Sequence, residues 1–257
     1  MTTQKRGIRH LVLGDVHGMH RKMMRSLEAA GFDGEHDSLI FLGDLADGRE
    51  SREVLEFVSA LRSRTLIFGN HEYALRSIMN GATDVVDSWL NAYGGRRTCW
   101  SYKVNPERIT LMGAAPDLPL IRFDDHVVSG RELLQRIFPP HHLALLDEMI
   151  PFLVMKQLCP GHDALLCHAG LTEGVAFSDH DDRMWTYGDR RWYERASGRN
   201  DLPVTVIFGH WHQFAHPIFA RHRIGLAMHS NVAVLSVEER VVWVGDDVYR
   251  IEKDWIC

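Results

Sequence analysis

The chain has few cysteines, no long apolar run and no large excess of either charge. Its four cysteines, Cys99, Cys159, Cys167 and Cys257, are irregularly spaced along 257 residues and form no C-x-x-C pair. Secreted domains that rely on disulfides carry more cysteines at regular spacings. We therefore expect reduced thiols and a cytoplasmic protein.

The other absences exclude several classes of partner. No apolar run approaches the ~20 residues that a membrane-spanning helix needs. Residues 1–10 are polar and basic, and they lack the apolar core of roughly 7–15 residues found in a signal peptide. The net charge is −5, with acids and bases mixed along the chain, so no basic patch typical of nucleic-acid binding is evident. We expect neither a membrane nor a nucleic-acid partner.

Composition and pattern predict an α/β fold. The chain is 45% hydrophobic and 25% charged, which is typical of globular proteins. Strands are expected at 10–15, 38–44 and 65–70, each followed by a helical pattern, and this order indicates parallel strands. The segment 81–150 is expected to be mostly helical, and strands return at 164–168, 204–210, 232–237 and 241–244. With no linker-like stretch, residues 1–257 are predicted to form one domain.

Five short motifs contain residues that commonly bind metals, and four of them follow an apolar run that predicts a buried strand. They are Gly14-Asp15-Val16-His17-Gly18, Gly43-Asp44, Gly69-Asn70-His71-Glu72, His168-Ala169-Gly170 and Gly209-His210-Trp211-His212. A glycine at a strand end lets the backbone turn, so the next side chain points out at the sheet edge where ligands bind. Gly-Asp and Gly-Asn also occur as simple turns, but three in order, with histidines or acids beside them, indicate a site.

The donor types suggest two metal ions. Asp15 and His17 can face one ion, Asp44 can bridge two, and Asn70, His168 and His210 can complete the second. Mixed nitrogen and oxygen donors favour manganese, iron or zinc over calcium or magnesium, and manganese is our first choice. Two ions about 3.5–4 Å apart lower the pKa of a shared water for attack on phosphorus. The sequence therefore predicts phosphate-ester hydrolysis.

The order of the motifs resembles that of the calcineurin-like metallophosphoesterases. More narrowly, it resembles the bacterial and phage branch of the phosphoprotein phosphatases, which includes Ser/Thr protein phosphatases and diadenosine tetraphosphate hydrolases. The pattern GDxHG, GDxxDRG, GNHE, HAG and GHT or GHxH spans residues 14–212, and 89–102 match a WL…GG…T…SY stretch. The resemblance implies a four-layer αββα sandwich with mixed sheets and a helical specificity segment at about 81–150.

The resemblance also implies roles for individual residues. The six donors named above would bind the metals, and a metal-bridging hydroxide would be the nucleophile. His71 would be the general acid that protonates the leaving group. Asp47 would hold and polarise His71, because a carboxylate partner raises the pKa of a histidine.

Two positions depart from the family pattern. The family's Asp-Arg-Gly reads Asp47-Gly48-Arg49 here, so the arginine that clamps phosphate is displaced by one residue. Arg49 either bends back into the site or is solvated, and Arg190 and Arg191 are the other candidates for phosphate binding. The second departure is His212, because a GHxH motif is more typical of phosphodiesterases and nucleases. We expect His212 to be an additional ligand of the first metal.

Three functions follow from these features. The leading hypothesis is a phosphomonoesterase of the Ser/Thr protein phosphatase type, acting on a phosphoprotein or a nucleotide-like small molecule. The alternative is a phosphodiesterase or dinucleoside polyphosphate hydrolase. A non-catalytic metal-binding scaffold is disfavoured because every ligand and His71 are present. Seven further histidines, including His141 and His142, lie in polar or turn-like stretches and are expected at the surface.

Overall fold

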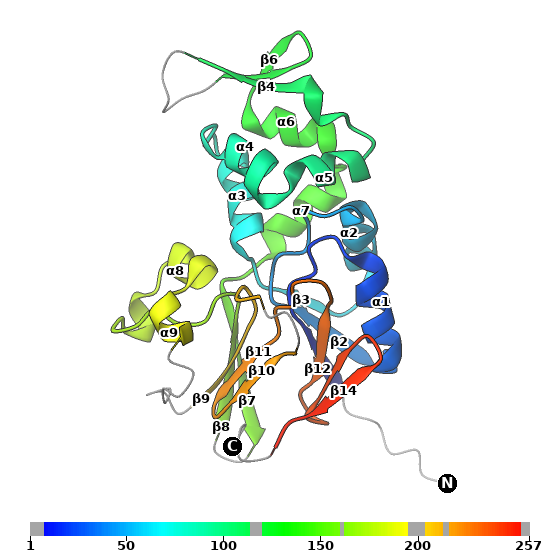
Figure 1. Cartoon of the computed structure of the whole chain (residues 1–257), viewed down its shortest axis with the longest axis vertical. Coiled ribbons are helices and arrows are strands. Elements are labelled where there is room, and N and C mark those ends of the chain that lie inside the picture. The colour runs from blue at the N-terminus through cyan, green and yellow to red at the C-terminus, as the bar shows by residue number, and fades with distance from the viewer. Residues whose placement is uncertain (1–7, 114–119, 160–161, 195–203, 213–215, 253–257) are drawn as a thin grey trace.

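Two β-sheets pack against each other between layers of helices in the computed structural model (Figure 1). The structure describes residues 8–113, 120–159, 162–194, 204–212 and 216–252. One sheet has six strands in the order β14-β13-β12-β1-β2-β3, and the other has five in the order β10-β11-β9-β8-β7. Helices α3 to α7 and a small sheet, β4-β5-β6, lie above the two large sheets in Figure 1.

The strands are β1 Arg9–Leu13, β2 Asp37–Phe41, β3 Arg64–Leu66, β4 Ile109–Met112, β5 Leu120–Phe123, β6 His126–Val128, β7 Phe152–Cys159, β8 His162–Cys167, β9 Val204–Phe208, β10 Ile218–Ala220, β11 Arg223–Gly225, β12 Ala233–Ser236, β13 Val241–Val244 and β14 Asp247–Arg250. The α-helices are α1 His20–Ala29, α2 Ser51–Ala60, α3 Asn70–Met79, α4 Val85–Ser88, α5 Gly95–Ser101, α6 Gly130–Ile137, α7 Pro140–Glu148, α8 Asp182–Tyr187 and α9 Arg190–Glu194. A π-helix, η1, spans Trp89–Tyr93, and two 3₁₀ turns are η2 Pro106–Arg108 and η3 Phe177–Asp179.

Side-chain alternation along the strands produces four layers. In β1, Leu11 and Leu13 pack into the core beneath α1 and α2, whereas Val12 points into the core between the two sheets. In β8, Leu166 faces the core between the sheets and Leu165 faces α8 and α9. Because successive strand residues point to opposite faces, each sheet is buried on both sides. The predicted αββα sandwich with mixed sheets is confirmed.

The parallel direction of neighbouring strands brings the loops that carry the five motifs to one edge of the sheets. The predicted parallel strands are confirmed, because β1 pairs with β2 and β2 pairs with β3 in parallel. In the second sheet β8 and β9 are also parallel. The carboxyl ends of neighbouring parallel strands share an edge, where ligands commonly bind. Strand β7, which pairs antiparallel with β8, was not foreseen from the sequence.

The middle segment is only partly helical. It contains α4, η1, α5, α6 and α7, but β4, β5 and β6 form an antiparallel sheet among them. In β5 the exposed Leu120 and Arg122 alternate with the buried Ile121 and Phe123. These strands have three or four residues each, too few for a clear period-two signal in the sequence.

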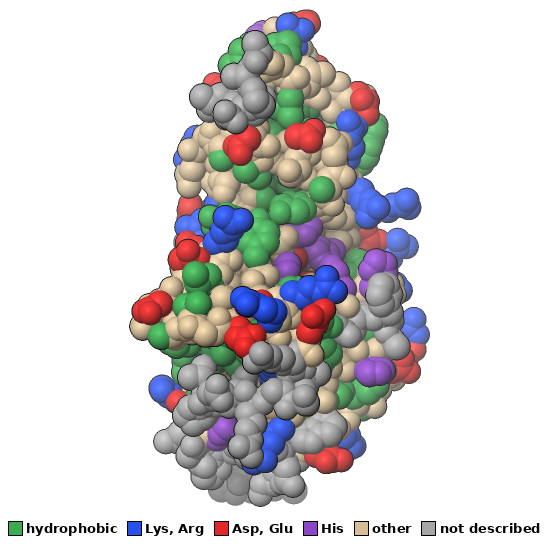
Figure 2. Space-filling view, turned by 60° about the vertical axis from the view of Figure 1, so that its left-hand side comes forward, with side chains coloured by type: hydrophobic (Ala, Val, Ile, Leu, Met, Phe, Trp, Pro, Cys, Tyr) green, Lys and Arg blue, Asp and Glu red, His purple; other side chains and the backbone are tan. Residues whose placement is uncertain are grey.

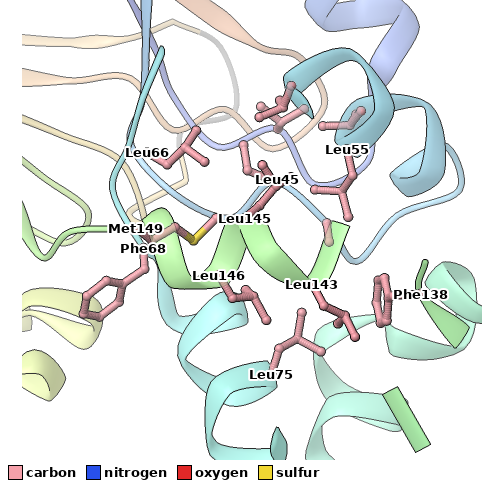
Figure 3. Close-up of a cluster of buried hydrophobic side chains, with 14 of the residues drawn as sticks. Leu45, Leu55, Leu66, Phe68, Leu75, Phe138, Leu143, Leu145, Leu146 and Met149 are labelled. Atoms are coloured by element: carbon pink, nitrogen blue, oxygen red, sulfur yellow. The ribbon is translucent and has the colours of Figure 1, made fainter. Parts of the chain in front are cut away.

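Helix α7 anchors the middle segment to the rest of the core. Figure 3 shows leucines of α7 pointing toward side chains of the neighbouring helices and loops. The residues labelled there are Leu45, Leu55, Leu66, Phe68, Leu75, Phe138, Leu143, Leu145, Leu146 and Met149. His142, which we expected at the surface, is instead buried on this helix at 2% exposure. The prediction for His142 was wrong because the helix turns it inward beside Leu143.

Two of the four cysteines have described side chains. Cys99 and Cys167 are buried free thiols. Cys257, the side chain of Cys159 and residues 1–7 lie outside the described part of the chain. Across the described residues, no helix has both the length and the apolar character needed to cross a membrane.

Candidate metal centre

The first group of donors comes from the loops after β1 and β9. His212 Nε2 lies 3.2 Å from Asp15 Oδ2, and His17 Nε2 lies 3.7 Å from the same oxygen. The two imidazole nitrogens, His17 Nε2 and His212 Nε2, are 2.9 Å apart. Asp15 is completely buried. These three residues, including His212 from the unusual fifth motif, could hold one metal ion.

The second group comes from α3 and the loops after β8 and β9. Asn70 Oδ1 lies 3.0 Å from His168 Nε2 and 2.9 Å from His210 Nδ1. The carboxylate of Asp44 lies between the two groups, with Oδ1 3.5 Å from His168 Nε2 and Oδ2 3.6 Å from His17 Nε2. The structure therefore brings together all seven residues that the sequence indicated as metal ligands.

The chemistry of the donor set fits divalent cations. The ligand atoms within each cluster lie within 4.8 Å of one another, which suits metal–ligand bonds of ~2.0–2.2 Å. His168 Nδ1 lies 2.7 Å from the carbonyl oxygen of Leu42. When Nδ1–H donates to that carbonyl, Nε2 keeps its lone pair toward the site, as metal-binding histidines require.

Ionisation states also suit metal binding. Burial opposes ionisation of Asp15, but hydrogen bonds with His17 and His212 outweigh it and hold the pKa of Asp15 well below its usual value. Burial opposes ionisation of Asp44 too, but the electrostatic effect of the surrounding histidines, His168 first, outweighs it and lowers the pKa of Asp44. Burial, and after it the electrostatic effect of His168, lower the pKa of His210 to about 4. Asp15, Asp44 and His210 therefore have the ionisation states that bind metals. Burial lowers the pKa of His17, but its hydrogen bond with Asp15 outweighs burial and raises that pKa.

The backbone is strained where it aims these donors. His17, Asp44, Asp47 and His210 have φ values of 44°, 52°, 69° and 59°, in the left-handed region. Residues other than glycine are uncommon there, and such conformations concentrate at functional sites. Gly43, before Asp44, has a φ of 102°, and an added Cβ would lie 2.5 Å from the backbone nitrogen of Gly69. Only glycine fits this crossing of two loops.

Glu72 holds the loop that carries Asp44. Its carboxylate accepts hydrogen bonds from the backbone N–H groups of Asp44, Leu45 and Gly69, at 2.8, 2.8 and 3.0 Å. The side chain is buried, so the three bonds replace the water that a carboxylate needs. The fourth residue of the Gly69-Asn70-His71-Glu72 motif thus fixes the backbone of Asp44.

His71 lies beside the two clusters and is held by Asp47. His71 Nδ1 is 2.8 Å from Asp47 Oδ2, and His71 Nε2 is 3.6 Å from Asp44 Oδ2. Burial lowers the pKa of His71, but the charges of Asp44 and Asp47 outweigh it and raise the pKa to about 10. His71 is therefore protonated at neutral pH in the protein alone, as a proton donor must be.

Two residues of the middle segment fix Asp47. Trp89 Nε1 and Thr98 Oγ1 donate hydrogen bonds of 3.0 and 2.9 Å to Asp47 Oδ1. Tyr93 packs over the His71 ring with centroids 4.8 Å apart. The stretch from Trp89 to Thr98, which matched the family only as a sequence pattern, therefore supports the His71–Asp47 pair directly.

Gly48 gives a steric reason for the displaced arginine. A Cβ at Gly48 would lie 1.9 Å from the carbonyl oxygen of His17, so no larger residue fits here without a shift of the loop. Ser51 Oγ fixes the same loop, accepting from the Gly48 N–H at 2.9 Å and donating to the Gly48 carbonyl at 2.8 Å. An arginine cannot occupy position 48 in this loop conformation, and Arg49 is the next position available.

Replacing Gly48 with alanine tests this close approach. We expect the Gly48→Ala variant to lose about 1–3 kcal/mol of unfolding free energy, the usual cost of overpacking, and to bind metal less tightly because His17 is pushed aside. Urea unfolding and metal analysis check both effects. Gly34→Ala is the matched control, since its Cβ would meet only Phe32 Cζ at an ordinary 3.8 Å. Equal stability of the two variants would contradict the steric reason.

A cleft of about 890 Å³ opens from His17, His71 and His212, and most charged residues that line it are basic. Its basic residues are Arg21, Lys22, Arg25, Arg49 and Arg97, with His229 at one side. Figure 2 shows histidines gathered at mid-height on one face, with Lys or Arg side chains near them. Arg21 is paired with Glu50 and Arg25 with Asp246. Among the described residues, no hydrogen bond or ion pair involves the side chain of Lys22, Arg49 or Arg97.

The three arginines predicted to bind phosphate differ in their position relative to the cleft. Arg49 lines the cleft, whereas Arg190 and Arg191 are not among its lining residues. Arg190 pairs with Glu194 at 2.6 Å and Arg191 with Asp189 at 3.0 Å. Lys22 and Arg97 were missed from the sequence. Their only signal was proximity in sequence to a motif, since Lys22 follows the first metal loop and Arg97 follows Gly94-Gly95.

Comparison with known proteins agrees with this geometry. Residues 8–214 match the calcineurin-like phosphoesterase family. The symmetrical bis(5′-nucleosyl)-tetraphosphatase of Coxiella burnetii strain CbuG_Q212 is 25% identical over 233 residues, covering 78% of this chain and 77% of that protein. The enzyme of the same name from Proteus mirabilis is 39% identical over 88 residues, 32% of each chain.

Solved structures share the fold at low sequence identity. A candidate diadenosine tetraphosphatase superposes with a TM-score of 0.55 at 17% identity, covering 97% of this chain and 95% of that one. A protein serine/threonine phosphatase from Saccharomyces cerevisiae gives a TM-score of 0.52 at 13% identity, covering 98% and 82%. The family match over most of the chain, together with the clustered donors and the His71–Asp47 pair, shows that the protein is a phosphoesterase hydrolase of the calcineurin-like phosphoesterase family.

Proposed function

We propose that the protein is a two-metal hydrolase of nucleoside polyphosphates, with dinucleoside polyphosphates as its preferred class of substrate. The observation that carries this proposal is a set of three cations, Lys22, Arg49 and Arg97, that line the same cleft as His71 and form no ion pair with any described residue. One phosphate needs only the cations nearest the metal centre. Several cations that line one cleft suit several linked phosphates.

The residues would act in defined roles. Asp15, His17 and His212 would hold one divalent ion, Asn70, His168 and His210 a second, and Asp44 would bridge them. Bound there, the two ions would supply Lewis acidity and a water of lowered pKa. His71, held through Nδ1 by Asp47, would deliver the Nε2 proton to the leaving phosphate oxygen. Manganese is the expected metal, with iron or zinc as alternatives.

The middle segment would supply specificity. Ala92, Tyr93 and Arg97 line the cleft and come from η1 and α5, so about 81–150 would form the substrate-binding part of a single domain. Tyr93 is half-buried over His71 and offers an aromatic face to a nucleobase. The named relatives, which are tetraphosphatases of dinucleosides, support this assignment over the protein phosphatase that the sequence alone favoured.

A phosphodiesterase is the second candidate, because of His212. Its Nε2 lies 3.2 Å from Asp15 Oδ2 and 2.9 Å from His17 Nε2, positions from which it would serve as a further ligand of the first ion. A diester carries one negative charge fewer than a monoester and needs fewer cations around it. Faster hydrolysis of a bis-aryl phosphate than of the mono-aryl phosphate and of dinucleoside polyphosphates would favour this function.

The test compares diadenosine tetraphosphate, a phosphoserine peptide, and mono- and bis-p-nitrophenyl phosphate with manganese present. We expect the highest kcat/KM for the tetraphosphate. Arg97→Ala should lower that value by roughly 10–100-fold, since a hydrogen bond to a charged group contributes about 1.5–3 kcal/mol. For p-nitrophenyl phosphate, which has no distal phosphate, we expect a much smaller loss.

Arg62→Ala is the matched control, because Arg62 is an exposed arginine paired with Glu35 away from the cleft. It should leave both substrates unaffected. Equal losses for the two substrates in Arg97→Ala would place Arg97 outside the distal-phosphate site. A phosphopeptide hydrolysed faster than the tetraphosphate would overturn the proposed substrate class.

A further inference from the structure

A second group of metal-ligand side chains lies away from the cleft, between α2 and α7. Glu56 comes from the middle of α2, and His141 and His142 come from the first turn of α7. Their ligand atoms lie within 4.8 Å of one another. None of the three lines the cleft or contacts the donors described above.

The two imidazoles converge on one carboxylate oxygen. His142 Nε2 is 3.0 Å and His141 Nε2 is 3.3 Å from Glu56 Oε2. Two donors bound to a tetrahedral zinc at ~2.0–2.1 Å lie about 3.4 Å apart. The two distances from Glu56 Oε2 to the imidazole nitrogens are therefore close to the ligand–ligand distance in tetrahedral zinc sites. Adjacent residues of a helix rarely face one another, because successive side chains diverge around its axis, yet both rings here turn toward Glu56 Oε2.

A further residue, Tyr102, contacts the ring nitrogen of His142 that does not face Glu56. The Tyr102 hydroxyl lies 2.6 Å from His142 Nδ1, and when Nδ1–H donates to that oxygen, Nε2 is left as a lone-pair donor. A hydrogen bond from the distal ring nitrogen is the usual support of a metal-binding histidine.

The exposure of these side chains suits a metal ion whose fourth ligand is a water molecule. His142 is buried, whereas Glu56 and His141 are exposed, with side-chain exposures of 63% and 53%. An ion could therefore enter from solvent and keep a water as its fourth ligand. Two histidines, one carboxylate and one open position form a donor set that zinc binds in proteins.

We propose that Glu56, His141 and His142 bind a zinc ion that joins α2 to α7, with Tyr102 as the residue that orients His142. Helix α2 begins at Ser51, whose hydroxyl holds the Gly48 loop between Asp47 and Arg49. Helix α7 is embedded in the core. The ion therefore joins α2, the helix that follows the Asp47 loop, to a helix packed in the core, and it stabilises the folded state because it binds only there.

Zinc stoichiometry tests the site without reference to activity. The full chain is stripped with chelator, dialysed against zinc alone, and its zinc content is measured by plasma mass spectrometry. We expect Glu56→Gln and His141→Ala each to hold one zinc fewer per chain than the unaltered protein. Asp44→Asn should lose zinc from the other centre and still keep this one. Adding Glu56→Gln to Asp44→Asn should remove it.

Further measurements separate a metal site from a structural ion pair. Tyr102→Phe should bind this zinc about 10–100-fold more weakly, the usual effect of removing the support of a ligand. Zinc should raise the Tm of the unaltered chain more than that of His141→Ala. In the presence of chelator the two proteins should have the same Tm. His36→Ala is the control, since His36 is an exposed histidine paired with Asp33. An unchanged zinc count in both Glu56→Gln and His141→Ala would overturn the proposal.

Discussion

Replacing His71 with alanine should lower kcat by roughly 10²–10⁴-fold on substrates whose leaving groups need a proton, the usual contribution of a general acid. The nearly buried ring is held at Nδ1 by Asp47 at 2.8 Å, and its Nε2 faces the metal donors, 3.6 Å from Asp44 Oδ2. With alanine the leaving oxygen has no proton donor. Steady-state kinetics on an alkyl phosphate and on p-nitrophenyl phosphate measure the loss.

The dependence on leaving group identifies the role of His71. p-Nitrophenolate leaves readily without a proton. The loss of kcat in His71→Ala should therefore be much smaller for p-nitrophenyl phosphate than for an alkyl phosphate. Asp47→Asn keeps a hydrogen bond to His71 but removes the charge, and it should give an intermediate loss. His36→Ala serves as the unaffected histidine control.

Metal content decides between two roles for His71, because its Nε2 also lies near His17 and Asp44 as a potential ligand. A general acid can be removed with both ions retained. If His71→Ala instead loses an ion, His71 is a ligand. Equal loss for activated and unactivated leaving groups would also contradict the assignment as an acid.

Replacing Asp44 with asparagine should cost both metal ions and, with them, nearly all turnover. Asp44 places one oxygen 3.6 Å from His17 Nε2 and the other 3.5 Å from His168 Nε2. Asparagine offers one neutral oxygen in the same volume and cannot bridge two cations. Because even the loss of a supporting hydrogen bond costs 10–100-fold in metal affinity, we expect at least about 10²-fold weaker binding. Metal analysis after dialysis measures it.

Asp15→Asn is the variant to compare with Asp44→Asn when testing whether Asp44 bridges the two ions. Asp15 belongs to the group with His17 and His212 only, so its variant should lose one ion and keep the other. Asp33→Asn, at an exposed carboxylate on the loop before β2, should keep both. Retention of two ions in Asp44→Asn, with circular dichroism unchanged, would show that Asp44 does not bridge.

The sequence determined the fold class and the identity of the donors, for a local physical reason. An apolar run that ends in glycine and a polar residue specifies a buried strand with a functional side chain at its tip, and that information lies within a few residues. The strands β1, β2, β8 and β9 could therefore be predicted from local pattern, whereas the four layers were implied by the resemblance to a known family. The seven side chains predicted as metal ligands do lie together. The short strands β4 to β6 could not, because three or four residues leave too little periodicity.

Tertiary structure decided what depends on distant segments meeting. Only the folded chain shows that Gly48 lies against the His17 carbonyl, which leaves no space for an arginine there and places Arg49 at the cleft. Only the folded chain brings Lys22 and Arg97 to one cleft, and Glu56 to His141 and His142. These contacts join residues tens of positions apart. Their geometry is set by how sheets and helices pack, and no local pattern in the sequence records that packing.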